Sequence, residues 1–363
     1  MHLCVVSKTY EEDLAAADRL DGLCASVAVF RAITGGNDVP PQVRRHRCPE
    51  ASEHLRSLLD DGLVDLVHVE GFYLLGHLPE PSPVPVLLVE QNIEYTLWEQ
   101  RVTLAEGATN QRRAFLDFRE TRAYELDAWQ RVTLCAAVTD DDRRTMLQLA
   151  PQLNVRVVPD GVDHLGSSPL APVAAQPELV FIANFAYQPN VDAAFWFCRE
   201  ILPRVRERVP DVRALLVGNG PPKKVQALAC ERVCVTGRVR SVAPYLDRAA
   251  VVVSPLRVGG GIKVKVLEAL CRGKAIVSTG VGIQGLGSGA SDCIAVADDA
   301  ATFAQSCSSL LRDPAARRKL EHRARTFGAA LPTWDEAAES LAACYRELVG
   351  ARQAFPLGSV GGR

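Results

Sequence analysis

Short apolar runs rich in β-branched residues alternate with helix-like segments along almost the whole chain. Clear examples are His2–Ser7, Val84–Glu90, Leu179–Ala183 and Ala250–Leu256. Strands that are apolar along their whole length are typical of parallel sheets with helices on both faces. The alternation therefore predicts an α/β protein with doubly wound parallel sheets. Further candidate strands are Leu63–Glu70, Val132–Thr139, Val155–Pro159, Val212–Val217, Val233–Gly237, Ala275–Ser278 and Cys293–Val296.

A segment without hydrophobic periodicity separates these strands into two series. Residues 165–178 are rich in Gly, Ser, Pro and Ala, a composition typical of a linker. At ~150 residues per domain, a chain of 363 residues is expected to form roughly two domains. We therefore expect one Rossmann-like domain over 1–164 and a second over 179–332. A helix over 333–350 and a flexible tail over 351–363 are expected to follow.

The charge balance and the cysteine pattern exclude several classes of protein. The chain has 41 Lys and Arg and 43 Asp and Glu, so it is not a generally basic nucleic-acid binder. Its 11 cysteines are scattered without a Cys-x-x-Cys pair, and we expect buried free thiols in a cytoplasmic protein. The N-terminus is typical of a first strand and not of a signal peptide, and no apolar run reaches the ~18 residues of a membrane span. No cluster of ligating side chains predicts a metal site, and nothing indicates an oligomeric state.

A glycine-rich junction in the second half is the strongest candidate site. A buried strand ends at Ser254, and a loop containing Gly259, Gly260 and Gly261 opens directly into a helix. Glycines allow the backbone to approach a ligand closely, and the amides of a helix N-terminus favour anions. This junction predicts a phosphate site. A P-loop is excluded because the Gly-Lys-Ser/Thr ending is absent.

Charged side chains surround the predicted phosphate site. Arg257, Lys263 and Lys265 would add full positive charges to the helix N-terminus. Lys265 and Glu268 are three residues apart and are expected to share a helix face, with Lys265 near a diphosphate and Glu268 near a sugar hydroxyl. The alternative is a surface pair beside an ordinary glycine turn. The apolar residues expected to face the sheet are Val264, Leu267 and Cys271.

Other strand ends carry weaker signals. Gly220 belongs to a Gly-x-Gly pattern without the third glycine of a dinucleotide fingerprint, so a tight turn is the alternative. Arg238 follows another strand and could hold a phosphate or a base, or be solvated. Asp140–Asp142 follow a strand and open a helix, and we interpret them as helix-capping residues, not metal ligands. In the first half, polar residues at two strand ends suit a hydroxylated acceptor, or a helix cap or core hydrogen bond; they are His68, Glu70, Gln91, Asn92 and Glu94.

The chain resembles retaining glycosyltransferase family 4, whose members have the GT-B fold. The resemblance covers most of 179–348. It is carried by Asn184–Phe197, Leu215–Pro222, Val235–Val239, Val251–Thr279 and the closing helix, and more loosely by His68–Tyr73, Gln91–Tyr95 and Val158–Asp163. The resemblance implies two Rossmann-like domains facing across a cleft, with the C-terminal helix crossing back onto the first domain. It implies a nucleoside diphosphate sugar as donor and no cofactor.

The resemblance also implies roles for individual residues. Glu268 matches the glutamate that binds the donor ribose, and Lys265 matches a lysine near the donor diphosphate. Gln91 stands where many members have a histidine close to the reacting sugar. The residues expected to contact the donor are Gly220, Arg238, Arg257, Gly259, Gly260, Gly261, Ile262 and Lys263, and those expected to contact the acceptor are His68, Glu70, Asn92 and Glu94.

Three positions depart from the family pattern. Gly260 replaces the first motif glutamate, eight residues before Glu268. Asn184 stands at the position of the usual arginine after the first strand of the second domain. Ser7–Leu20 lacks the usual glycine-rich loop.

The predicted function is sugar transfer from a nucleoside diphosphate sugar to a hydroxylated acceptor, with retention of configuration and without a metal. The implied partners are this nucleotide sugar and a small-molecule acceptor of glycan or natural-product biosynthesis. Three alternatives stay open. They are a non-catalytic nucleotide- or sugar-binding protein of the same fold, a nucleotide-sugar epimerase and, with less support, an NAD-dependent dehydrogenase.

Overall fold

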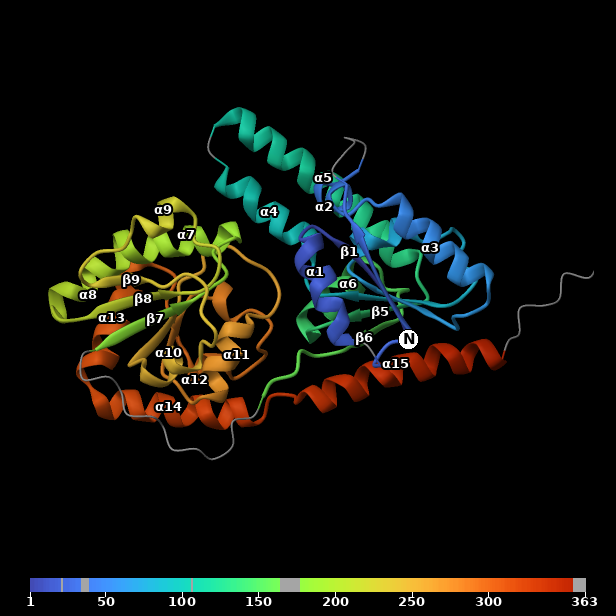
Figure 1. The fold of residues 1–363 in the computed structure, drawn as a ribbon. Helices are drawn as coiled ribbons and strands as arrows, with labels where there is room; N and C mark the ends of the chain where they lie inside the picture. The colour runs from blue at the N-terminus through green and yellow to red at the C-terminus, as the bar shows by residue number, and fades with distance from the viewer. Residues whose placement is uncertain (21, 34–38, 106, 164–176, 355–363) are drawn as a thin grey trace, which may run out of the picture. The chain divides into compact units, whose positions relative to one another are not determined.

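The computed structural model describes residues 1–363 except 21, 34–38, 106, 164–176 and 355–363 (Figure 1). The chain divides into two compact units. Unit 1 comprises Met1–Val158 and Ala338–Arg363, and unit 2 comprises Pro159–Ala337. Most of the predicted linker, 165–178, lies outside the described residues, as does the end of the predicted tail.

Unit 2 contains a parallel six-stranded sheet in the order β12-β11-β10-β7-β8-β9. The predicted strands of the second half are confirmed, with small shifts at their ends. The order reverses between β7 and β10, and ligands of doubly wound sheets bind at such a reversal, outside the carboxyl ends of the strands. The elements are β7 Glu178–Ile182, α7 Gln188–Trp196, π-helix η3 Phe197–Ile201, α8 Leu202–Arg208, β8 Arg213–Val217, α9 Lys223–Gln226, β9 Val233–Val235, α10 Ala243–Arg248, β10 Val251–Ser254, α11 Val264–Cys271, β11 Ile276–Ser278, η4 Val281–Ile283, α12 Ala290–Cys293, β12 Ala295–Val296, α13 Ala300–Arg312 and α14 Pro314–Ala329.

Helices cover both faces of this sheet (Figure 1). One hydrophobic core includes Phe197 and Phe303, from the helices α7, η3, α8 and α13 on one face. The other includes Leu267 and Leu270 of α11, together with residues of α10, α12 and α14. The expectation that Val264 faces the sheet is wrong: Val264 is 55% exposed, whereas Val266 and Leu267 are the buried residues of this part of α11.

Unit 1 contains a parallel four-stranded sheet, β3-β4-β5-β6, and a separate parallel pair, β1-β2. Figure 1 shows α4 and α5 side by side as a helical hairpin. Helix α15, Trp334–Ala354, begins in unit 2, and from Ala338 onward it belongs to unit 1. The elements of unit 1 are β1 His2–Ser7, α1 Tyr10–Ala17, η1 Asp18–Leu20, β2 Ser26–Arg31, α2 Pro41–Arg45, α3 Pro49–Asp60, β3 Val67–Glu70, η2 Phe72–His77, β4 Val86–Glu90, α4 Glu94–Leu104, α5 Ala108–Gln130, β5 Leu134–Ala137, α6 Asp140–Leu149 and β6 Val155–Val157.

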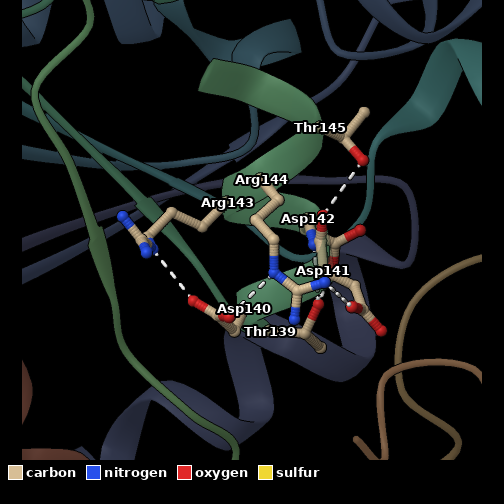
Figure 2. A network of polar contacts seen from close by, with 7 residues as sticks. All are labelled: Thr139, Asp140, Asp141, Asp142, Arg143, Arg144 and Thr145. Atoms are coloured by element: carbon tan, nitrogen blue, oxygen red, sulfur yellow. Dashed lines mark hydrogen bonds and ion pairs between the residues drawn. The ribbon is translucent and has the colours of Figure 1, made fainter. Parts of the chain in front are cut away.

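The start of α6 shows how the predicted acidic cap is organised (Figure 2). The capping residue is Thr139, whose hydroxyl accepts from the Asp142 amide at 3.0 Å and donates to its carboxylate at 2.7 Å. The Asp140 carboxylate accepts from the Nε atoms of Arg143 and Arg144, each at 3.0 Å. The cluster therefore stabilises a helix start, although through Thr139 and not through an aspartate cap.

Three further expectations concern thiols, metals and membranes. All 11 cysteines are free, but Cys230 and Cys234 are exposed on unit 2, so the expectation of buried thiols is wrong for these two. In the part of the chain that the structure describes, no group of three or more His, Cys, Asp or Glu side chains could hold a metal ion. None of the described helices combines the length and the apolar character needed to cross a bilayer.

Glu125 of α5 caps the neighbouring helix α4 and predicts a pH effect on stability. Its fully buried carboxylate accepts from the amides of Glu94 and Tyr95, each at 2.8 Å, and burial raises its pKa to about 8. Between the ordinary glutamate pKa and this value, the folded state binds more protons than the unfolded state, so stability falls as the pH rises, by at most about 1.4 kcal/mol per pH unit. We expect the free energy of unfolding, measured with denaturant between pH 5 and pH 8, to fall less steeply with pH in E125Q than in the wild type. The control E120Q, at an exposed residue of the same helix, should keep the wild-type slope. Equal slopes in E125Q and wild type would contradict the assignment.

Candidate functional site

The loop between β10 and α11 has the backbone geometry that its glycines predict. Gly259 and Gly261 have φ values of +154° and +61°, which favour glycine. Lys263, at the N-cap of α11, is 9% exposed, and its Nζ donates to the carbonyl oxygens of Gly260 at 2.9 Å and Gly261 at 2.5 Å. Lys263 therefore stabilises the loop, because its ammonium group binds the carbonyl oxygens of both glycines.

Lys265 lies at the point where the strand order reverses. Its Nζ donates to Asn190 Oδ1 at 2.8 Å and lies 5.0 Å from the centre of the Phe181 ring. The Asn190 amide in turn donates to the carbonyl of Asn184 at 2.8 Å. Burial, and then the charge of Lys263, lower the pKa of Lys265 to about 7. Burial partly desolvates the ammonium group of Lys265. Because this group pairs with no carboxylate of the described residues, it is available to bind an anion.

Glu268 lies one turn further along α11 and lines a pocket of about 220 Å³ within unit 2. Partial burial raises the pKa of Glu268, Arg272 opposes the rise, and Asp163 adds to it. Lys265 and Glu268 thus have different surroundings: the first contacts α7 and β7, and the second faces the pocket beside α10. The pocket is lined by Gly161, Val162, Asp163, Ser241, Val242, Ala243, Val264, Leu267, Glu268, Cys271, Arg272 and Trp334.

The other residues predicted to contact the nucleotide-sugar donor differ in whether their side chains are already engaged in contacts within the protein. Arg257 forms a bidentate ion pair with Asp192, at 3.0 and 2.5 Å, and lies 5.6 Å from the Trp196 ring, so its charge is already matched. Arg238 is exposed after β9 and makes no hydrogen bond or ion pair within the described chain. Gly220 has a φ of +63°, and Ile262 packs against the core beside α11.

Three of the predicted acceptor residues meet at the ends of β3 and β4. His68 Nε2 lies 3.0 Å from Glu70 Oε1, and Gln91 Nε2 donates to Glu70 Oε2 at 3.0 Å. Partial burial of Glu70 tends to raise its pKa, but the contacts with His68 and Gln91 outweigh this effect and lower the pKa. His68 Nδ1 also lies 2.7 Å from the hydroxyl of Tyr345 on α15.

The other two acceptor candidates lie apart from this group. Glu94 opens α4 and accepts from Gln42 Nε2 at 2.5 Å, and burial raises its pKa. Asn92 is half-buried and makes no hydrogen bond within the described chain.

Comparison with known proteins finds a family likeness within unit 2. Residues 176–313 match the family model described as glycosyl transferases group 1, and this range contains Lys265, Glu268 and the whole glycine loop. Most of unit 2 is therefore similar to the glycosyl transferases group 1. A curated relative, an uncharacterized 44.6 kDa protein in the cps region of Klebsiella pneumoniae, is 20% identical over 158 residues, 41% of each chain. The match therefore spans about two fifths of that relative.

Solved structures extend the likeness to almost the whole chain. Sucrose-phosphate synthase from Thermosynechococcus elongatus has a TM-score of 0.68 at 17% identity, covering 97% of this chain and 100% of that one. HepE from Anabaena, solved with UDP and glucose, has a TM-score of 0.64 at 13% identity, covering 96% and 92%. These structures confirm the predicted GT-B fold.

Proposed function

We propose that the protein transfers a sugar from a nucleoside diphosphate sugar to a hydroxylated acceptor. The observation that carries this proposal is Lys265, in the first turn of α11 at the strand-order reversal. Its ammonium group is partly desolvated and pairs with no carboxylate among the residues that the structure describes. A diphosphate supplies the negative charge that such a group and a helix N-terminus favour. The group 1 family match supports the same donor class.

The spacing along α11 suits a nucleoside diphosphate. Glu268 is three residues after Lys265, which corresponds to about 4.5 Å along the helix axis. A ribose follows directly after the diphosphate in such a donor, so its hydroxyls would donate to the Glu268 carboxylate. The pocket beside Glu268 would then receive the base. HepE, which shares the fold, was solved with UDP and glucose.

The proposed chemistry breaks the bond between the anomeric carbon and the phosphate oxygen. The acceptor oxygen bonds to the same carbon with retention of configuration, and its proton passes to the released diphosphate. Negative charge develops on the leaving group, and Lys265 and the amides of α11 stabilise it electrostatically without a metal. Because Gly260 replaces the family's glutamate, the loop backbone would contact the donor sugar. His68, Glu70 and Gln91 of unit 1 would bind the hydroxyls of an acceptor from glycan or natural-product biosynthesis.

Ligand-induced stabilisation followed by a turnover assay tests this proposal. We expect UDP-, GDP-, ADP- or dTDP-sugars to raise the melting temperature, since a ligand at 100 times its Kd stabilises by about 2.7 kcal/mol. The stabilising donor should then release its nucleoside diphosphate in the presence of hydroxylated acceptors. Binding without turnover across a broad acceptor panel would instead favour a binding protein, and an epimerised sugar formed without acceptor would favour an epimerase. No stabilisation by any nucleotide would contradict the proposal.

A further inference from the structure

Four side chains form a continuous polar chain in unit 1, from Tyr345 on α15 through His68 and Glu70 to Gln91. The Tyr345 hydroxyl lies 2.7 Å from His68 Nδ1. His68 Nε2 lies 3.0 Å from Glu70 Oε1, which is an ion-pair distance without the angles of a hydrogen bond. Gln91 Nε2 donates to the second carboxylate oxygen, Glu70 Oε2, at 3.0 Å. Tyr345 is separated from His68 by 277 residues, so only the return of α15 to unit 1 completes the chain.

The carboxylate of Glu70 sets the direction of its hydrogen bond with Gln91. An ionised carboxylate only accepts hydrogen bonds, so the Gln91 amide must turn its NH2 group toward Glu70 and its carbonyl oxygen away. The contact with Glu70 favours a proton on the nearer ring nitrogen of His68, Nε2, and Nδ1 then serves as the acceptor. Burial raises the pKa of Tyr345, so its hydroxyl stays protonated and donates to Nδ1.

Packing does not explain why the exposed end of this polar chain, Glu70 and Gln91, is ordered. The side chain of Glu70 is 55% exposed and Gln91 is exposed, whereas that of His68 is only 20% exposed. Holding long polar side chains in one rotamer at the surface costs up to about 1.5–2 kcal/mol of conformational entropy each. Hydrogen bonds between neutral groups and exposed ion pairs contribute about 0–1.5 kcal/mol, which does not exceed this cost. A fixed Gln91 amide is therefore more useful for recognition than for stability.

We propose that Tyr345 is a positioning residue that orients Gln91, through His68 and Glu70, so that the Gln91 carbonyl oxygen accepts a hydrogen bond from a substrate hydroxyl. This inference rests on the proposed sugar transfer. In this inference Gln91 recognises hydroxyl groups of the acceptor, and helix α15 contributes Tyr345 to the acceptor site of unit 1.

The variant Y345F tests the inference because it removes the hydroxyl and keeps the ring that packs against His68. We expect kcat/KM for the acceptor to fall about tenfold, with the nucleoside diphosphate Kd unchanged. In a Q91A background, Y345F should cause no further loss, since the residue it positions is gone. The control is E347Q, also on α15. It weakens the contacts with Asn154 and Arg156, leaves the four side chains of the polar chain unchanged, and should keep wild-type kinetics.

A second readout follows the His68 ring itself. Nitrogen-15 NMR of the imidazole should show the Nε2-protonated tautomer in the wild-type protein and a mixture in Y345F. An Nδ1-protonated ring in the wild type, equal kinetics in Y345F and wild type, or an equal loss from Y345F with and without Gln91 would each overturn the positioning role. Absence of any sugar transfer by the wild-type protein would instead overturn the proposed function.

Discussion

Replacing Lys265 with methionine is expected to slow sugar transfer by about 100- to 1000-fold, the usual cost of removing one group that stabilises charge in a transition state. Methionine keeps an unbranched apolar stem beside Phe181 but loses the ammonium group that donates to Asn190. The folded protein should not lose stability beyond that one hydrogen bond, because the variant also removes a desolvated charge. The exposed lysine of α14, changed as K319M, should leave transfer unchanged.

The K265M variant should also change how nucleotide affinity depends on pH. In the free site Lys265 has a pKa of about 7, because burial disfavours its charged form. A diphosphate binds the protonated form, so its affinity should fall as the pH rises above 7, approaching tenfold per unit. K265M should bind weakly and without this decline between pH 7 and pH 9. A rate within a few-fold of wild type, or the same pH slope in both proteins, would contradict the role of Lys265.

The second large effect is expected from E268A, which should weaken binding of a nucleoside diphosphate by about 10- to 100-fold. Hydrogen bonds to a charged group contribute roughly 1.5–3 kcal/mol, and the Glu268 carboxylate is proposed to accept them from the ribose. Calorimetry with the ribonucleotide and its 2′,3′-dideoxy analogue separates this role from a general electrostatic one.

E268A should leave the affinity for the dideoxy analogue almost unchanged, because that ligand has no hydroxyl to donate. The matched control is E207A, an exposed glutamate on α8 that makes no hydrogen bond or ion pair within the described chain. Equal losses for the two nucleotides in E268A would show that Glu268 does not contact the ribose.

The fold of this protein could be predicted well because its central strands are buried on both faces. Runs such as Val84–Glu90 and Leu179–Ala183 are apolar along their length and stand out from the amphipathic helices around them. Strand β2, Ser26–Arg31, was not predicted; it pairs with β1, and none of its residues is buried as those of the central strands are. Its apolar content is therefore a weaker signal than that of the central strands.

The candidate site could be predicted only in part because side-chain contacts depend on tertiary packing. Glycines before a helix predict a phosphate site, and Lys265 follows them in the first turn of α11. The spacing does not reveal that Lys263 turns back onto the loop carbonyls or that Arg257 pairs with Asp192. Asn190 could have been suspected, since it lies in the first turn of the helix after β7, at the strand-order reversal. Tyr345 could not, because its partner His68 is 277 residues away.

A crystal structure of the protein with a bound nucleoside diphosphate tests the central claim most directly. We expect the diphosphate within hydrogen-bond distance of Lys265 Nζ and of the amides that open α11, with the ribose hydroxyls at Glu268. A diphosphate bound at another strand end, such as the Gly218–Gly220 turn after β8, with Lys265 still bonded to Asn190 alone, would contradict this account.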